Sequence, residues 1–387
     1  MGRGAPALVE PFLKTRRPLD LERMDAGELR LCRWVDGDQT IDDALITVRR
    51  QPSGEAVVDI SLHGGPRIVQ RVLMMLKRAG ARIVDRMDLV RESWPAAGTV
   101  EQEMLQLLLT AKTRAVASWL IGMPGRLSTQ IDRIIRDLHT GQLAPARSSL
   151  ARLCDHAGRV PYLLDGVRVV LIGEPNAGKS MLANILAERE HAIVSDLPGT
   201  TRDWVEHPGA IEGAPFTFVD TAGLGQSRDP IEREAVRRAR RQVASADIVL
   251  RVIDGSQPPA PADRQAVEDH REQRRRDHVR RKELFAWNKS DLPRRAEYLA
   301  LMARVAKAGV AVSARTGAGL AELRRKLSQT VGLDNWPGEM PAPFTARQIK
   351  ACRRALSALT RAEPDRPGAV RWLNRVIGPA FSPEDRP

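Results

Sequence analysis

The segment 173–180 has the residue types and the spacing that bind a nucleoside triphosphate. It reads Gly-Glu-Pro-Asn-Ala-Gly-Lys-Ser and fits the phosphate-loop pattern, in which backbone N–H groups and a lysine surround the phosphates. The apolar run 167–172 precedes the loop, and an amphipathic run follows it. A loop between a strand and a helix directs the free N–H groups and the positive dipole end of the helix at the phosphates. The sequence therefore predicts a triphosphate site at Gly173, Asn176, Ala177, Gly178, Lys179 and Ser180.

The choice of nucleotide is indicated by Asn288, Lys289 and Asp291, which follow the apolar run 284–287. That run predicts a strand, and doubly wound sheets bind ligands at the carboxyl ends of their strands. The Asp291 carboxylate can accept two hydrogen bonds from guanine, one from the ring N–H and one from the exocyclic amine. Adenine lacks this pair of donors and would leave the carboxylate desolvated and unpaired. We therefore predict that the site selects guanine nucleotides.

Residues at the ends of other predicted strands fit magnesium-assisted phosphate chemistry. Asp220 and Gly223 belong to an Asp-Thr-Ala-Gly sequence after the strand-like run 216–219, and Asp220 can reach a magnesium ion through water. Upstream, a hydroxyl from Thr200 or Thr201 can complete the magnesium shell when the γ-phosphate is present.

Ser313 and Ala314 end another short strand and can close over the base. Each of these signals is weak alone. Together, in this order and each at the end of a strand, they predict a GTP-binding domain.

The N-terminal region has the pattern of a small α/β unit. The segment 55–62 alternates like a strand, and a helix with apolar residues at helical spacing follows Pro66 and closes at Gly80. The run 81–84 again looks like a strand. We therefore predict at least one β-α-β element within the first ~95 residues.

Helical patterns bracket the GTP-binding segment on both sides. The segment 100–157 is helical, with predicted breaks at 123–125 and 141–145, and helical spacing returns in 349–359 and 370–376. We predict an α/β fold: a P-loop GTPase domain, with a mostly parallel sheet and helices on both faces, inserted in a helical domain. The predicted domains are a small N-terminal α/β unit, the first helical part, the GTP-binding domain and the second helical part, at 1–95, 96–160, 161–334 and 335–387.

Composition sets further limits. The chain has 387 residues, 42% of them hydrophobic, which is enough for more than one core. The net charge of +13 favours an anionic macromolecular partner, although a high arginine content also occurs on ordinary protein surfaces. Its three cysteines are far apart, so neither a disulfide framework nor a zinc site is indicated. No apolar run approaches the ~18 residues of a membrane span. We therefore expect a soluble, cytoplasmic protein without a membrane partner.

The chain resembles the MnmE (TrmE) family of tRNA-modification GTPases. The resemblance rests on the phosphate loop with its Pro-Asn pair, on the run 192–203, and on the segment 220–224. Outside the GTP domain, 62–66 resembles the N-terminal signature of the family, and 345–348 resembles the start of its late helical segment. The resemblance implies a cytoplasmic, homodimeric, potassium-activated GTPase. It also implies that the GTPase modifies the wobble uridine of tRNA with the flavoprotein MnmG and a folate one-carbon donor.

The resemblance also suggests roles for single residues. Many GTPases orient the attacking water with a glutamine where this chain has Leu224, which cannot hydrogen-bond. By the resemblance, Asn176 and carbonyls of the loop 191–199 hold a potassium ion near the phosphates, Glu232 orients the water, and Thr200 joins the catalytic set. The alternatives are a turn-forming residue for Asn176 and an acidic residue favoured by the helix dipole for Glu232.

Two other features have equally simple structural explanations. His63 belongs to the family-like turn, but it fits a cap of a strand-to-helix turn as well. The arginine-rich stretches 237–241 and 271–282 could follow a phosphate backbone or form a solvated helical face.

The chain departs from the family pattern at three places. Its last residues contain no cysteine where the family has a Cys-containing tail motif, its first residues resemble a loop that the family places after its first strand, and 84–96 is shorter than the corresponding connection. Two outcomes stay open: a tRNA modifier that works without the tail motif, or a degenerate relative that kept only the GTP-dependent switch. A ribosome-assembly or RNA-associated GTPase of the Era or Der kind is the alternative enzyme class.

Overall fold

The computed structural model describes residues 4–15, 18–25, 27–50, 54–63, 65–84, 88, 98–187, 205–220, 243–275, 282–293, 296–334, 336 and 340–378. They form two compact units, one made of described residues up to 88 and the other of described residues from 98 onward. None of the described helices is long and apolar enough to cross a membrane.

The N-terminal unit is a four-stranded sheet of order β1-β2-β3-β4 in which all neighbours are antiparallel. Alternate residues of β2 and β3, including Trp34 and Ile46, are buried with Val72 and Met75 of α2. The elements are α1 (Ala5–Val9), a 3₁₀ turn (Glu10–Phe12), β1 (Leu13–Lys14), β2 (Arg30–Asp36), β3 (Gln39–Arg50), β4 (Ala56–Ser61) and α2 (Pro66–Arg78).

The strand predicted at 81–84 is wrong, and the β-α-β element predicted with it is absent from this unit as described. Gly80 has a left-handed backbone, with φ of 105°, and the Ala81 N–H donates to the Leu76 carbonyl at 2.9 Å. This 6→1 bond closes the C-terminus of α2. The apolar residues after it therefore follow a helix cap and have no strand to pair with.

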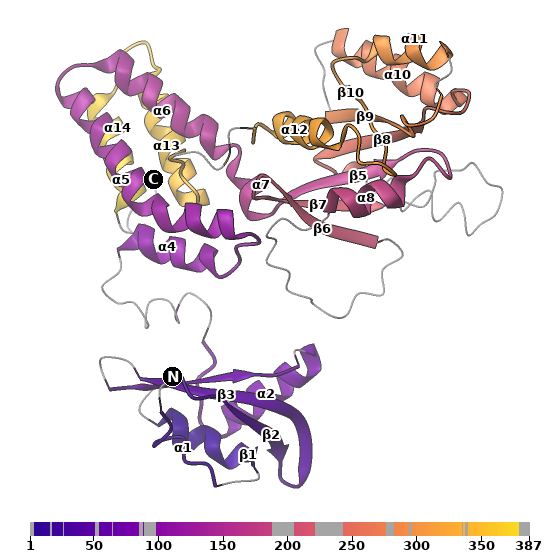
Figure 1. The fold of residues 1–387 in the computed structure, drawn as a ribbon. Helices are drawn as coiled ribbons and strands as arrows, with labels where there is room; N and C mark the ends of the chain where they lie inside the picture. Colours follow the sequence, from indigo (N-terminus) through magenta and orange to yellow (C-terminus); the bar gives the residue numbers. More distant parts are fainter. Residues whose placement is uncertain are drawn as a thin grey trace. The chain divides into compact units, whose positions relative to one another are not determined.

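The helices on either side of the GTPase segment pack in one bundle, drawn in purple and yellow in Figure 1. The C-terminal helices contact the earlier ones directly, α13 against α6 and α14 against α5. Trp119 of α5 packs edge-on against Trp336 and Phe344, which precede α13. The helices are α4 (Thr99–Leu108), α5 (Arg114–His139), α6 (Leu143–Ala157), α7 (Val160–Leu164), α13 (Ala346–Leu359) and α14 (Arg366–Ile377).

The helix break predicted at 123–125 is also wrong, because α5 runs through Pro124 without interruption. A proline inside a helix costs about 3 kcal/mol. Pro124 is buried, and its neighbours Met123 and Leu127 are fully buried in the bundle core. This packing offsets the lost backbone bond. A break does occur at Gly141, whose φ of 81° separates α5 from α6.

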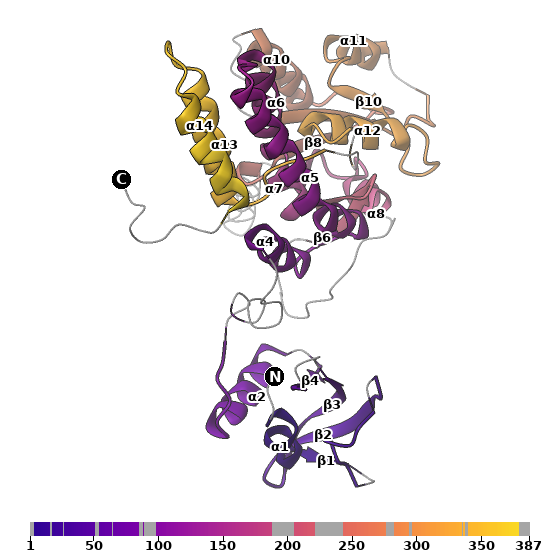
Figure 2. The same cartoon turned by 90° about the vertical axis from the view of Figure 1, so that its left-hand side faces the viewer.

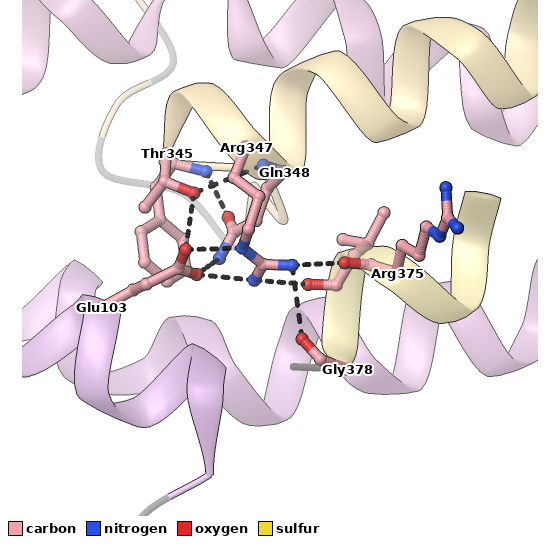
Figure 3. A network of polar contacts seen from close by, with 8 residues as sticks. Glu103, Thr345, Arg347, Gln348, Arg375 and Gly378 are labelled. Atoms are coloured by element: carbon pink, nitrogen blue, oxygen red, sulfur yellow. Dashed lines mark hydrogen bonds and ion pairs between the residues drawn. The ribbon is translucent and has the colours of Figure 1, made fainter. Parts of the chain in front are cut away.

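A buried polar network fastens α4 to both C-terminal helices (Figure 3). Glu103 accepts hydrogen bonds from Arg347 Nε at 2.7 Å and Nη2 at 2.8 Å, and from Gln348 Nε2 at 2.7 Å. Arg347 also donates to the carbonyls of Arg375, Val376 and Gly378 at the end of α14. It thereby satisfies carbonyls that a helix end leaves without partners. The ion pair is only 14–15% exposed, and removing one partner of such a pair typically costs about 3–5 kcal/mol.

The GTPase segment forms a six-stranded sheet of order β10-β9-β8-β5-β7-β6. Only the β6–β7 pair is antiparallel, so the predicted mostly parallel sheet is confirmed. Both faces of β5 are buried: Val169 and Leu171 join the main core, and Val170 and Ile172 join a second cluster. The elements are β5 (Val167–Ile172), α8 (Lys179–Ala187), β6 (Val205–Ile211), β7 (Ala214–Asp220), β8 (Ile248–Asp254), α10 (Pro261–Arg275), β9 (Lys282–Asn288), α11 (Ala296–Arg304), β10 (Gly309–Ala311) and α12 (Leu320–Val331).

The turn between β6 and β7 is hydrogen-bonded to the helical bundle. The hydroxyl of Thr113, the N-cap of α5, donates to the Gly213 carbonyl at 2.6 Å and accepts from the Val116 N–H at 3.2 Å. Thr113 is 1% exposed. One buried hydroxyl thus begins the longest helix of the bundle and binds the hairpin at the edge of the sheet.

Candidate nucleotide-binding site

The phosphate loop joins β5 to α8, as the sequence predicts, and its glycines are required by space. Gly173 and Gly178 have φ of 147° and 91°. A Cβ at Gly173 would lie 2.1 Å from the Val252 carbonyl oxygen, and one at Gly178 would lie 2.3 Å from Asn288 Nδ2. Only glycine fits at either position, so the loop lies directly against β8 and the Asn288 side chain.

Lys179 is 7% exposed and lies over the loop that precedes it. Its ammonium donates to the carbonyls of Gly173 at 3.1 Å and Glu174 at 3.0 Å. Burial lowers the pKa of Lys179, and the nearby Asp220 and Glu174 carboxylates oppose that shift. The ammonium is therefore poorly solvated, and a phosphate would supply the anionic partner that the carbonyls replace only in part.

Ser180 and Asp220 form the part of the site that fits a magnesium ion. The Ser180 hydroxyl donates to Asp220 Oδ2 at 2.5 Å. The other carboxylate oxygen, Oδ1, is buried and has no hydrogen-bond partner among the described residues. A hydroxyl beside an unsatisfied carboxylate oxygen is the set of hard oxygen donors that Mg²⁺ prefers.

Asn288 joins three loops at the base end of the site. Its side chain is 2% exposed. Nδ2 donates to the Ala177 carbonyl of the phosphate loop at 2.8 Å, and Oδ1 accepts from the Ala314 N–H at 3.0 Å. Asn288, Ala177 and Ala314, predicted separately from three motifs, are therefore in direct contact.

The Asp291 carboxylate is oriented by two neighbours. Oδ1 accepts from the Ser313 hydroxyl at 2.5 Å, and Oδ2 accepts from Arg315 Nε at 3.1 Å and Nη2 at 2.5 Å. The hydrogen bonds from Ser313 and Arg315 lower the pKa of Asp291. The group is thus an ionised acceptor of fixed orientation, as two guanine donors require. Sequence reasoning missed Arg315, which follows Ala314 directly and shares Oδ2 with any incoming base.

Lys289 is held by a carboxylate that sequence reasoning also missed. Its φ is 60°, and its ammonium donates to Asp254 Oδ2 at 2.6 Å. Asp254 Oδ1 accepts from the hydroxyl and the N–H of Ser256. Burial alone would raise the pKa of Asp254, but the bonds from Lys289 and Ser256 outweigh it and lower the pKa. Asp254 is the last residue of β8, at the same edge of the sheet as Asp220 and Asn288, and that position is the signal that could have identified it.

Asp263, in the first turn of α10, is a second missed carboxylate. It is 3% exposed, and burial raises its pKa to about 6, with Arg251 lowering it and Glu174 of the phosphate loop raising it further. Ionisation of Asp263 therefore costs the fold free energy as the pH rises through about 6.

Asn176 is exposed and has a left-handed backbone, with φ of 62°. Asparagine tolerates this conformation better than most residues, which agrees with the interpretation of Asn176 as a turn former. Its exposed side chain remains accessible. The predicted residues Thr200, Thr201, Gly223 and Glu232 lie outside the described residues, as do Leu224, the stretch 237–241 and the segment 276–281 of the second arginine-rich stretch.

His63 belongs to the N-terminal unit and bonds to β3. Its backbone N–H donates to Asp42 Oδ2 at 2.9 Å, and Nδ1 lies 2.7 Å from Asp42 Oδ1. Burial would raise the pKa of Asp42, but the hydrogen bonds from His63 lower it overall, so the carboxylate is the acceptor. These bonds tie the turn before α2 to the sheet, which is the structural explanation considered for His63.

The bonds described above connect the predicted site residues into one continuous set. Ser180 bonds to Asp220, the phosphate loop bonds to Asn288 through Ala177, and Asn288 bonds to Ala314. Ser313 then bonds to Asp291. The residues predicted to bind the triphosphate and those predicted to bind the base therefore lie together at the carboxyl edge of the parallel strands.

Comparison with known proteins agrees with this geometry. A family model described as "50S ribosome-binding GTPase" matches residues 168–289. A protein of Aquifex aeolicus (strain VF5) is 31% identical over 86% of this chain and 78% of its own length. Corresponding proteins of Laribacter hongkongensis (strain HLHK9) and Roseiflexus sp. (strain RS-1) are 32% and 33% identical, over 84% and 98% of this chain and 76% and 86% of their own lengths. All three are named "tRNA modification GTPase MnmE".

The chain belongs to the MnmE family of GTPases. It is a GTP-binding protein and a GTP hydrolase. The similarity extends across the N-terminal unit and the helical bundle as well as the GTPase domain, because the match to the Roseiflexus protein covers 98% of the chain.

Asp291→Asn should change the nucleotide preference of this MnmE-family protein from guanine to xanthine. The amide offers a donor where xanthine has a carbonyl oxygen in place of the guanine amine, whereas guanine loses a charge-assisted bond worth about 1.5–3 kcal/mol. Titration calorimetry with GTP, XTP and ATP measures the change. A wild-type protein that binds ATP as tightly as GTP would contradict the assignment of Asp291.

Proposed function

We propose that this GTPase acts in the modification of the wobble uridine of tRNA, together with an MnmG-like flavoprotein. The observation that carries the proposal is the extent of the family match. Relatives named tRNA modification GTPase align with nearly the whole chain, including the parts that do not bind nucleotide. The net charge of +13 is in keeping with a tRNA partner.

We propose the following roles in the GTP cycle. Lys179 contacts the β- and γ-phosphates, Ser180 and Thr201 ligate Mg²⁺, and Asp220 reaches the ion through water. Gly223 would belong to the GTP-binding set. At the other end, Asp291 reads the guanine edge, while Lys289, Ser313 and Ala314 enclose the base.

Potassium is the proposed source of the positive charge that hydrolysis requires. Leu224 cannot position water, so Glu232 would orient the water and Thr200 would complete the catalytic set. Asn176 would ligate K⁺ through its amide oxygen. The support is that the Asn176 side chain is exposed beside the phosphate loop, in a backbone conformation that the loop imposes.

The N-terminal unit, within the predicted domain 1–95, is proposed to bind a folate one-carbon donor and to take part in a homodimer. We also propose that the protein acts in the cytoplasm and that the segments 96–160 and 335–387 make one helical domain around the GTPase domain at 161–334. The contacts of α13 with α6 and of α14 with α5 support this last division.

GTP turnover should fall by on the order of tenfold or more when K⁺ is replaced by Na⁺, because a charge directed at the developing transition state is lost. Asn176→Gly should give the same low rate in both salts. Glycine keeps the left-handed backbone at φ of 62°, whereas alanine would add strain of about 1–2 kcal/mol and confuse the result. Asn176→Asp, which tolerates the backbone and keeps an oxygen ligand, is the matched control and should retain the K⁺ dependence. Equal wild-type rates in both salts would contradict the potassium proposal.

Deletion of the gene in its host should abolish the wobble-uridine modification that mass spectrometry of digested tRNA detects. The wild-type gene should restore it, and the Asp291→Asn gene should restore less of it, because that variant binds GTP more weakly. Unchanged modification in the deletion strain would leave a GTPase without a role in tRNA modification. The ribosome-associated alternative would then be tested by measuring ribosomal RNA binding of variants in the stretches 237–241 and 271–282.

A further inference from the structure

The two C-terminal helices carry much of the positive charge of the chain on a small surface. Within 346–378 the acidic residues are Glu363 and Asp365, and Asp365 is engaged as the N-cap of α14. Against them stand Arg347, Lys350, Arg353, Arg354, Arg361, Arg366, Arg371 and Arg375. Figures 1 and 2 show α13 and α14 side by side, so these cations gather on one helical pair.

Helical spacing places part of this charge in a stripe. Lys350 and Arg354 are four residues apart on α13, and Arg371 and Arg375 are four residues apart on α14, so each pair shares a face. We call these four cations together with Trp372 the basic stripe. Like charges at this spacing destabilise a helix by about 0.2–0.5 kcal/mol per pair. Helix stability therefore does not favour this spacing of like charges.

The ion pairing of the stripe bears on what it can bind. Some arginines of the chain are paired with carboxylates, as Arg49 is with Asp59, Arg251 with Glu283 and Arg347 with Glu103. In the part of the chain that the structure describes, Lys350, Arg354 and Arg371 have no carboxylate partner. Their charge therefore remains available to an external anion.

Trp372 joins the two halves of the stripe and orients its guanidinium groups. The Arg354 guanidinium carbon lies 4.5 Å from the indole centroid, and that of Arg375 lies 4.7 Å from it. Such contacts are attractive at distances below ~6 Å. In Figure 3 the Arg375 side chain extends away from the Glu103 network that its own carbonyl joins. A guanidinium held against an aromatic ring loses less rotamer freedom on binding, and its planar fork matches a phosphate.

We propose that the basic stripe binds the phosphate backbone of an RNA. The apolar residues of both helices, such as Ala355, Leu359 and Leu373, are already buried in the bundle, so no apolar face is left to enter a membrane. Clustered arginines beside an aromatic side chain are typical of RNA-binding surfaces. The inference rests on the proposed function, in which tRNA is the partner, and it assigns a surface to that partner.

The test compares charge variants of the full-length protein in binding to a fluorescein-labelled tRNA transcript. The stripe variant combines Lys350→Gln, Arg354→Gln and Arg371→Gln. The control removes the same number of charges from exposed positions of α5, with Arg126→Gln, Arg133→Gln and Arg136→Gln. Fluorescence anisotropy is followed over a range of salt concentrations. GTP turnover and thermal unfolding confirm that each variant is folded.

We expect the stripe variant to bind tRNA roughly tenfold or more weakly than the control. The tRNA association constant falls as the salt concentration rises. The steepness of that fall, in a plot of log K against log salt concentration, should decrease by about 2–3, because each lost phosphate contact contributes ~0.7–0.9 to the slope. Trp372→Leu removes no charge, so it should weaken binding severalfold with little change in slope. The affinity for heparin, measured in parallel, should be unchanged by Trp372→Leu.

Equal tRNA affinity and slope in the stripe variant and the control would overturn the inference while leaving the proposed function intact. A second outcome would be that Trp372→Leu leaves the affinities for tRNA and heparin unchanged while the stripe variant loses affinity for both equally. In that case the surface binds polyanions in general, and the RNA assignment is wrong. If the wild-type protein binds no tRNA, the inference also fails. The deletion experiment then decides the proposed function independently.

Discussion

The amide of Asn288 is the interaction on which the nucleotide site depends. One buried side chain donates to the phosphate loop at the Ala177 carbonyl and accepts from the loop after β10 at the Ala314 N–H. Asparagine is suited to this position because its amide offers a donor and an acceptor in one plane. Leaving either buried partner unsatisfied costs about 1–3 kcal/mol. The triphosphate end and the base end of the site are therefore held at a fixed separation by a group that contacts the loops from inside.

The sheet brings these groups to Asn288, and local contacts then orient them. Strands β5, β8 and β9 are adjacent and parallel, so their carboxyl ends lie at one edge. At that edge Lys289 bonds to Asp254, Asp291 bonds to Arg315, and Ser180 bonds to Asp220. Each pairing holds a charged or polar group near the position where a nucleotide would contact it. The described groups are thus largely preorganised, and under the proposed role of Asp291 a guanine would have to share this carboxylate with Arg315.

Where a motif stands at the end of a strand, the structure places the residues that the sequence predicted together at one edge of the sheet. The phosphate loop and the residues around Asn288 follow apolar runs, and parallel pairing fixes where such runs end. Partners without a motif were missed: Asp254 and Arg315 take their roles from residues distant in the chain, and so does Glu103. The two wrong predictions about the fold have the same origin. The run 81–84 has strand propensity but follows a helix cap, and Pro124 is retained in a helix because burial outweighs its local cost. Local patterns show what a segment favours, and tertiary contacts decide between close alternatives.

The most direct test of this account is GTP affinity measured by titration calorimetry on Asn288→Asp, with thermal unfolding recorded on the same samples. Aspartate keeps the size of the side chain and the acceptor for the Ala314 N–H, but it places a carboxylate oxygen against the Ala177 carbonyl. The account predicts that GTP affinity falls on the order of ten- to hundredfold, because one buried bond worth about 1–3 kcal/mol is lost. The unfolding transition should remain cooperative. An Asn288→Asp protein that folds normally and binds GTP as tightly as the wild type would contradict the central role of this side chain.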